Sequence, residues 1–141
     1  MRLLRSIAGT STGSIIAALL AQGLRVDEVI ELYRNLAKSV FIRPWWRLGL
    51  FQPRYNKAAL EGYLKKRLGA ACPLGDRQSL RTGLLVVTKR LATGSPWPLT
   101  NNPRGRYFNA RSGSHPIPNA DYPLWKVVRA STAAPTFFAP E

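Results

Sequence analysis

The spacing of apolar residues along the chain predicts alternating strands and helices. Leu3, Leu4, Ile7 and Ala8 form a short apolar stretch that is typical of a buried strand. A run of Ile, Ala and Leu over residues 15–21, soon followed by a glycine, predicts a helix next along the chain. Strands that alternate with helices indicate an α/β fold.

The same periodicity predicts three more helices and a second strand. Residues 26–37 and 57–68 each place their apolar side chains on one helical face, and residues 124–131 form a shorter helical segment. We expect Asp27 to cap the first of these helices. Residues 84–88 are a continuous apolar run rich in β-branched side chains, which predicts a strand buried on both faces of a parallel sheet.

The remaining stretches predict connections and one edge strand. Residues 93–105 are crowded with Gly, Pro and Asn, which is typical of an exposed loop. Residues 106–111 fit an edge strand, and residues 112–123 fit a second loop. No internal repeat or domain boundary interrupts residues 1–141, so they are interpreted as one domain.

The charge balance adds an anionic partner to this picture. The chain has 21 Lys and Arg against 7 Asp and Glu, a formal net charge of +14. Dense positive charge attracts both anionic phospholipids and nucleic acid. The sequence holds no zinc-finger, RNP1-like or KH-like motif, so a nucleic-acid partner is not favoured. Arginine enrichment in a genome of high GC content would also explain the charge.

Two tryptophans are candidates for contact with a membrane. Trp45 and Trp46 lie between Arg43 and Arg47, and Trp beside Arg suits a lipid–water interface. Packing of both rings against the core is the alternative interpretation. No stretch approaches the roughly 20 apolar residues of a membrane-spanning helix.

The single cysteine and single histidine limit the chemistry that the chain can perform. Cys72 alone excludes an internal disulfide, which fits a reducing compartment, and we expect a cytoplasmic protein that lies peripherally at a membrane. His115 is surrounded by Ser, Gly and Pro, as in a loop. A Ser-His-Asp triad would have to use it, and an ordinary surface histidine is the alternative.

The strongest candidate for catalysis is the pentapeptide Gly9-Thr10-Ser11-Thr12-Gly13. It spells G-x-S-x-G between the first predicted strand and the first predicted helix, which is the order of a nucleophile elbow. The serine must stand exposed on a sharp turn, so we expect Gly9 and Gly13 to provide room where a Cβ would clash. The free N–H groups and positive dipole end of the helix would then face a developing oxyanion. This pattern predicts a serine hydrolase with Ser11 as nucleophile, although the bare motif also occurs in flexible turns.

Four segments together resemble the patatin-like phospholipase family. They are Gly9-Thr10-Ser11-Thr12-Gly13 with Ile15-Ile16-Ala17, Tyr55-Asn56 followed by Leu60, Gly83-Leu84-Leu85-Val86-Val87-Thr88, and Arg129-Ala130-Ser131-Thr132-Ala133-Ala134-Pro135-Thr136-Phe137-Phe138. The resemblance runs nearly end to end. It implies a three-layer α/β fold with a mainly parallel central sheet, and a Ser-Asp dyad without histidine, metal or cofactor.

The resemblance also implies a substrate and a role for each elbow residue. Members of that family hydrolyse acyl esters of phospholipids or neutral lipids. Ser11 would be the acyl-enzyme nucleophile, and the N–H of Thr12 would contribute to the oxyanion hole. The segment from Ala130 to Phe138 resembles the family's lead-in to the catalytic aspartate and is interpreted as scaffold.

The chain departs from the family pattern at both ends. The family's Asp-Gly-Gly-Gly oxyanion loop precedes the elbow, yet only eight residues precede Gly9 here. The dyad aspartate normally lies in an Asp-Gly-Gly or Asp-Gly-Ala turn beyond the Ala-Ala-Pro segment, and the sequence ends before one occurs. We therefore expect a single partial domain whose fold is incomplete at both ends. Loss of an oxyanion donor costs about 10²- to 10³-fold in rate and loss of the base about 10⁴-fold, so this segment alone should be nearly inactive.

A second class of function stays open at this point. The cationic and aromatic surface would also suit a non-catalytic module that binds anionic membranes or nucleic acid. Such a module would not depend on the hydroxyl of Ser11, whereas a hydrolase would.

Overall fold

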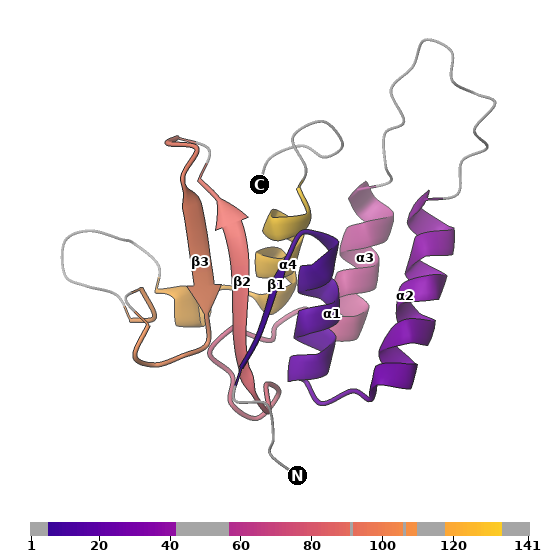
Figure 1. The fold of residues 1–141 in the computed structure, drawn as a ribbon, viewed down its shortest axis with the longest axis horizontal. Coiled ribbons are helices and arrows are strands. Elements are labelled where there is room, and N and C mark those ends of the chain that lie inside the picture. Colours follow the sequence, from indigo (N-terminus) through magenta and orange to yellow (C-terminus); the bar gives the residue numbers. More distant parts are fainter. Residues whose placement is uncertain (1–5, 42–56, 91, 106, 110–117, 134–141) are drawn as a thin grey trace.

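The computed structural model describes residues 6–41, 57–90, 92–105, 107–109 and 118–133 (Figure 1). The elements are β1 (Ser6–Thr10), α1 (Thr12–Ala21), α2 (Val26–Phe41), α3 (Lys57–Leu68), β2 (Gly83–Lys89), β3 (Pro96–Thr100), a short 3₁₀ helix (Asn119–Asp121) and α4 (Leu124–Thr132). All four predicted helices are present, and helices and strands combine in an α/β arrangement. The predicted α/β class is therefore confirmed.

The strands form a mixed sheet in the order β1-β2-β3. β1 runs parallel to β2, with Thr10 opposite Val87, and β2 runs antiparallel to β3, with Lys89 opposite Pro96. β3 lies inside residues 93–105, so the prediction of a loop there was wrong. Its prolines are tolerated because β3 is an edge strand of this sheet, where missing N–H donors can face away from the neighbour.

The predicted edge strand over residues 106–111 was also wrong. Within that range the structure describes residues 107–109, which form a turn and a bend. Tyr107 has another role, because its ring centroid lies 4.4 Å from that of Trp97 on β3. Stacking on a neighbouring strand has taken the place of strand pairing.

The two faces of the sheet differ in burial. Leu84 and Val86 of β2 are buried, whereas Leu85 and Val87, which point to the other face, are only partly buried. β2 is therefore not buried on both faces as predicted. α1 and α4 pack against the buried face, and α2 and α3 pack on these two helices from outside. In the described part of the chain the opposite face of the sheet stays open, with Ala8 exposed.

The main hydrophobic core lies between the sheet and the helices. Its fully or nearly fully buried members include Ala18 and Leu19 of α1, Leu64 of α3, Leu84 of β2 and Val128 of α4. As the 3.6-residue period predicts, every α-helix contributes apolar side chains to this core, whereas Ile16, Val26 and Ile30 are exposed. No helix in the described segments is both long enough and apolar enough to cross a bilayer.

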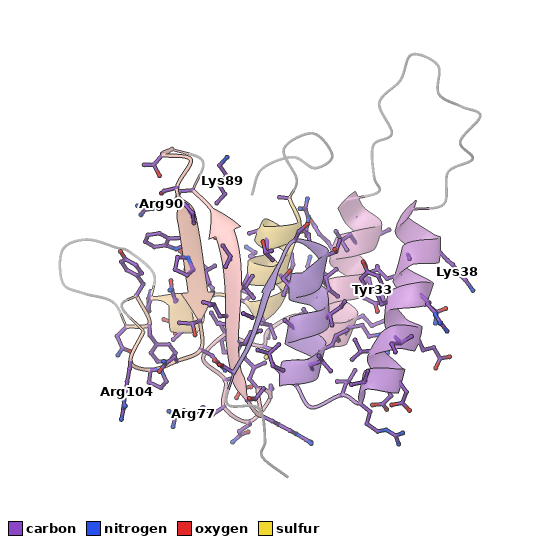
Figure 2. All side chains as sticks on the ribbon, in the orientation of Figure 1. Tyr33, Lys38, Arg77, Lys89, Arg90 and Arg104 are labelled. Carbon is purple, nitrogen blue, oxygen red and sulfur yellow. The ribbon has the colours of Figure 1, made fainter. Side chains whose placement is uncertain are left out.

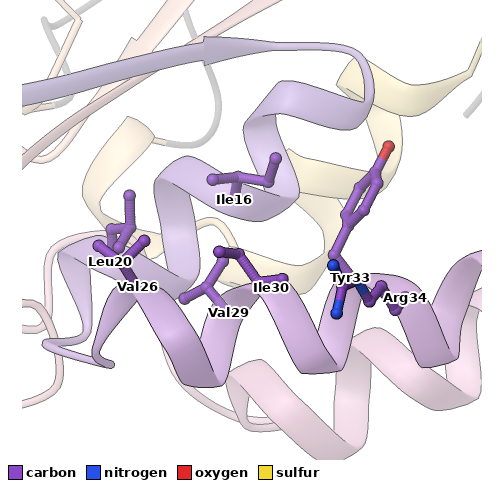
Figure 3. A pocket seen from close by; sticks show the side chains of 7 residues that line it. All are labelled: Ile16, Leu20, Val26, Val29, Ile30, Tyr33 and Arg34. Carbon is purple, nitrogen blue, oxygen red and sulfur yellow. The ribbon is translucent and has the colours of Figure 1, made fainter.

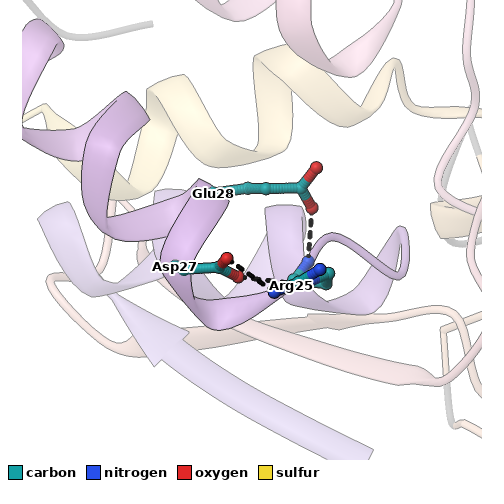
Figure 4. A network of polar contacts seen from close by, with 3 residues as sticks. All are labelled: Arg25, Asp27 and Glu28. Carbon is teal, nitrogen blue, oxygen red and sulfur yellow. Dashed lines mark hydrogen bonds and ion pairs between the residues drawn. The ribbon is translucent and has the colours of Figure 1, made fainter.

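The start of α2 shows a capping arrangement that differs from the prediction (Figure 4). The helix begins at Val26, so Asp27 lies inside its first turn and is not the cap. The backbone N–H of Arg25 donates to Glu28 Oε2 at 2.8 Å, which is the reach-back bond of a capping box. Asp27 instead accepts two hydrogen bonds from the Arg25 guanidinium, at 3.1 and 2.8 Å.

Candidate active site

Ser11 forms the whole connection between a strand and a helix. β1 ends at Thr10 and α1 begins at Thr12. Ser11 has φ +50° and ψ −132°, and it is the one non-glycine residue with positive φ in the described ranges. A non-glycine residue held in such a sparsely populated region costs about 1–3 kcal/mol and persists only where its surroundings enforce it. The predicted strand, turn and helix order is thus present, with an exposed Ser11 at its apex.

The two glycines of the motif differ in what they do. A Cβ built on Gly9 would lie 2.5 Å from the carbonyl oxygen of Gly13 and 2.8 Å from Ser14 Cα, so β1 can approach α1 this closely only with glycine there. A Cβ on Gly13 would have no described atom within 4 Å. The expected need for room is confirmed at Gly9. At Gly13 it is wrong for the described part of the chain, because no described atom would crowd a Cβ there.

Ser131 on α4 holds the elbow from the side. The backbone N–H of Ser11 donates to Ser131 Oγ at 2.9 Å, and Ser131 Oγ donates to the carbonyl oxygen of Val87 at 2.7 Å. One hydroxyl therefore connects the elbow, β2 and α4. Sequence reasoning treated Ser131 as scaffold, because nothing in its local pattern indicates a contact 120 residues away.

Ser14 binds the other backbone group of Ser11, its carbonyl oxygen. Its side chain is fully buried, and both its N–H (3.0 Å) and its Oγ (2.6 Å) donate to the carbonyl oxygen of Ser11. The N–H and the C=O of Ser11 are both engaged, which holds the strained backbone in place. The exposed hydroxyl of Ser11 is left as the group that can react.

The first turn of α1 offers hydrogen-bond donors beside this hydroxyl. The N–H groups of Thr12 and Gly13 make no hydrogen bond to any described residue, as is usual in the first turn of a helix. Such donors carry the positive end of the helix dipole. Negative charge that develops near Ser11 would therefore meet N–H donors that are already in position.

Helix α4, which carries Ser131, is anchored to α3. Arg129 is fully buried, and its Nε lies 3.9 Å from Glu61 Oε1. Trp125 donates from Nε1 to the carbonyl oxygen of Ala70 at 3.1 Å, and Lys65 Nζ lies 4.3 Å from the centre of its ring. These contacts fix the position of α4, and hence that of the hydroxyl that holds the elbow.

The three aspartates of the chain serve other purposes. Asp27 pairs with Arg25, and Asp121 lies exposed in the 3₁₀ helix. Asp76 accepts hydrogen bonds from Ser79 Oγ and from the N–H of Gln78, and these bonds lower the pKa of its carboxyl group. None of these three aspartates forms a hydrogen bond with Ser11. No three His, Cys, Asp or Glu side chains of the described segments come together as metal ligands.

Three of the predicted candidates cannot be placed. Trp45, Trp46 and His115 lie outside the described residues. Membrane contact by the two tryptophans stays a prediction, and so does the surface interpretation of the histidine.

An apolar groove of about 240 Å³ lies between α1 and α2 (Figure 3). Leu20 and Val26 line one end of it, and Tyr33 and Arg34 line the other. Val26 is 64% exposed, and Ile16 and Ile30 are also exposed along the groove. The groove lies on the outer side of α1, away from the sheet.

Comparison with known proteins identifies the family. A family model described as "Patatin-like phospholipase" matches residues 2–141. The chain belongs to the patatin-like phospholipase family. This match covers nearly the whole chain, and it confirms the resemblance that the four sequence segments indicated. The family consists of serine acyl-ester hydrolases.

Curated relatives of this patatin-like chain come from animals and bacteria. It is 29% identical over 138 residues to calcium-independent phospholipase A2-gamma of Oryctolagus cuniculus. The matched region covers 94% of this chain and 18% of that protein. It is 31% identical over 138 residues to the cGAMP-activated phospholipase of Escherichia coli, which covers 95% of this chain and 35% of that protein. It is 30% identical to an intracellular phospholipase A2 of Caenorhabditis elegans over 133 residues, which covers 94% of this chain and 11% of that protein. The chain therefore spans well under half the length of these relatives.

Proposed function

We propose that this protein is a lipid acyl hydrolase that cleaves acyl ester bonds of phospholipids with Ser11 as its nucleophile. The observation that carries the proposal is the geometry of Ser11. Its backbone is strained, its N–H and C=O are both hydrogen-bonded, and its side chain is exposed. Membership of the patatin-like family and relatives named as phospholipases support the lipid substrate.

The proposed reaction proceeds in two steps. Ser11 Oγ attacks the carbonyl carbon of the ester while a base takes its proton, and the carbonyl oxygen gains negative charge. The N–H of Thr12 donates to that oxyanion, with the elbow residues Gly9, Thr10 and Gly13 shaping the turn. The C–O bond then breaks, the lysolipid leaves with the proton, and an acyl-enzyme remains. Water hydrolyses the acyl-enzyme, releases a fatty acid and restores the Ser11 hydroxyl.

The base in this mechanism is the aspartate of a Ser-Asp dyad. Asp27, Asp76 and Asp121 are engaged or lie elsewhere, so we do not assign the role to any of them. Without that base a serine loses about 10⁴-fold in rate. We therefore expect residues 1–141 expressed alone to turn over substrate very slowly.

Within the described residues, the sheet also has room for further layers and strands. The open face of the sheet, where Leu85 and Val87 are only partly buried, and the outer edge of β1 can accept further elements. We propose that the complete fold has three layers around a mainly parallel sheet. A cytoplasmic location with peripheral contact at a membrane fits this function.

The test compares the product of the gene expressed from its own locus, with its natural flanking DNA, and residues 1–141 alone. Each is prepared with Ser11 and as Ser11→Ala, and fatty acid released from phospholipid vesicles is measured. We expect turnover by the locus product, its loss in Ser11→Ala, and little turnover by residues 1–141. A non-catalytic cationic module would show no dependence on Ser11, and turnover that survives Ser11→Ala would overturn the proposal.

A further inference from the structure

The end of the β2–β3 hairpin combines two cations with aromatic rings. Lys89 is the last residue of β2 and is exposed, and Arg90 follows it. The N–H of Arg90 donates to the carbonyl oxygen of Ser95 at 2.9 Å, and the N–H of Gly94 donates to the carbonyl oxygen of Arg90 at 2.8 Å. These bonds close the turn and hold both cations at its end.

The guanidinium of Arg90 lies over the ring of Trp97, which is itself paired with Tyr107. Its Cζ lies 3.9 Å from the ring centre of Trp97, which in turn lies 4.4 Å from that of Tyr107 with the planes tilted by 31°. All three residues are partly exposed. A guanidinium stacked on a ring has its N–H donors in its own plane, directed past the ring edge, where they suit phosphate oxygens. Trp and Tyr are the side chains enriched at the level of lipid headgroups.

The hairpin end lies on the same side of the molecule as Ser11. β1 and β2 are parallel, and Thr10 pairs with Val87, so β2 continues for two residues past the elbow, or about 7 Å. Figure 2 shows Lys89 and Arg90 at this end of the sheet and Arg77 and Arg104 at the opposite end. A surface that touches the hairpin end therefore also faces the elbow.

The charge around the hairpin is uniformly positive in sequence. Residues 77–120 contain seven basic residues and no acidic residue, so no carboxylate of this segment can neutralise Lys89 or Arg90. Positive charge beside amphipathic rings complements anionic phospholipid headgroups.

We propose that the hairpin end, defined as Lys89, Arg90 and Trp97, docks the protein on anionic phospholipid membranes with Ser11 facing the lipid. The choice of a lipid as partner rests on the proposed function. Lys89 and Arg90 bind the headgroup phosphates, and Trp97 lies at the interface. The proposed docking residues do not include Trp45 and Trp46, the candidates in the sequence, which lie outside the described residues.

Vesicle co-sedimentation tests this proposal without any need for catalysis. Binding of the full chain is measured with vesicles of equal parts phosphatidylglycerol and phosphatidylcholine, and pure phosphatidylcholine vesicles serve as reference. The test variant is Lys89→Gln/Arg90→Gln, and the matched control is Arg77→Gln/Arg104→Gln, which loses the same charge from exposed positions at the far end of the sheet. Thermal unfolding verifies that both variants are folded, and a DNA duplex is tested in parallel.

We expect the hairpin variant to lose about 30-fold in partitioning to anionic vesicles, since each of the two cations near such a surface contributes about five- to sixfold. The far-end variant should lose less than about threefold. Equal losses in the two variants would overturn the proposal, and so would a hairpin effect on duplex binding with none on vesicles. Ser11→Ala should bind vesicles like the unmodified chain, so a protein that docks through the hairpin but does not hydrolyse lipid would contradict only the proposed function.

Discussion

Ser131 Oγ accepts a hydrogen bond from the backbone N–H of Ser11 and donates one to the carbonyl oxygen of Val87. The elbow is therefore held by a side chain from the other end of the chain. This contact also withdraws the N–H of Ser11 from any role toward a substrate. The donors left for an oxyanion are those of the following residues on α1, beginning with Thr12.

Ser131→Ala should loosen the elbow. It removes both hydrogen bonds, so we expect a loss of about 1–3 kcal/mol in the free energy of unfolding and a slower reaction of Ser11 with a fluorophosphonate probe. The second effect is measured as the rate at which the probe labels the protein expressed from its own locus. Thr132→Val is the control, because among the described residues the Thr132 hydroxyl bonds within α4, to the carbonyl oxygen of Arg129 at 2.9 Å. Equal labelling rates for folded Ser131→Ala and the unmodified protein would contradict the assigned role.

Alanine substitution should separate the two glycines of the motif. Gly9→Ala places a Cβ against the backbone of α1 and should cost at least about 2 kcal/mol of stability, as overpacking against backbone does. Gly13→Ala meets open space in a helix and should stabilise the fold by up to about 1 kcal/mol. Urea unfolding of both variants measures the difference. A similar loss in both would show that Gly13 is also tightly packed.

Arg129→Ala tests the anchoring of α4. The side chain is fully buried beside Glu61, so its removal leaves both a void and a carboxylate without this cation. We expect a loss of about 3–5 kcal/mol in the free energy of unfolding. Lys126→Ala, at an exposed position of the same helix, should change it by less than about 1 kcal/mol. A loss of that small size in Arg129→Ala would mean that the buried cation does not stabilise the helix packing.

Asp76 should make stability depend on pH in the acid range. Its pKa is lowered by hydrogen bonds from Ser79 Oγ and the Gln78 N–H, so the ionised carboxylate is favoured in the folded state. The resulting stability is present above the ordinary carboxyl pKa and is lost as pH falls through the lowered one. The free energy of unfolding of Asp76→Asn should therefore approach that of the unmodified protein as pH falls below the ordinary carboxyl pKa and through the lowered one. A gap between the two proteins that stays constant from neutral to acid pH would contradict this assignment.

The sequence was sufficient to predict the helices and the elbow, because both depend on local patterns. Apolar spacing placed α2, α3 and α4 close to their observed bounds, and G-x-S-x-G marked the turn at Ser11. It did not predict β3, since the prolines of that strand are loop signals until pairing with β2 is known. The sequence also did not predict the role of Ser131, because that role depends on the packing of α4 against β2. That a Cβ on Gly13 would meet no described atom likewise follows only from three-dimensional contacts.

The site of covalent modification tests the central claim most directly. The locus product is treated with a fluorophosphonate, digested with trypsin and analysed by mass spectrometry for the peptide that spans residues 6–25. We predict one adduct on Ser11, which disappears in Ser11→Ala together with the release of fatty acid. An adduct on another residue, or hydrolysis that continues in Ser11→Ala, would contradict the account.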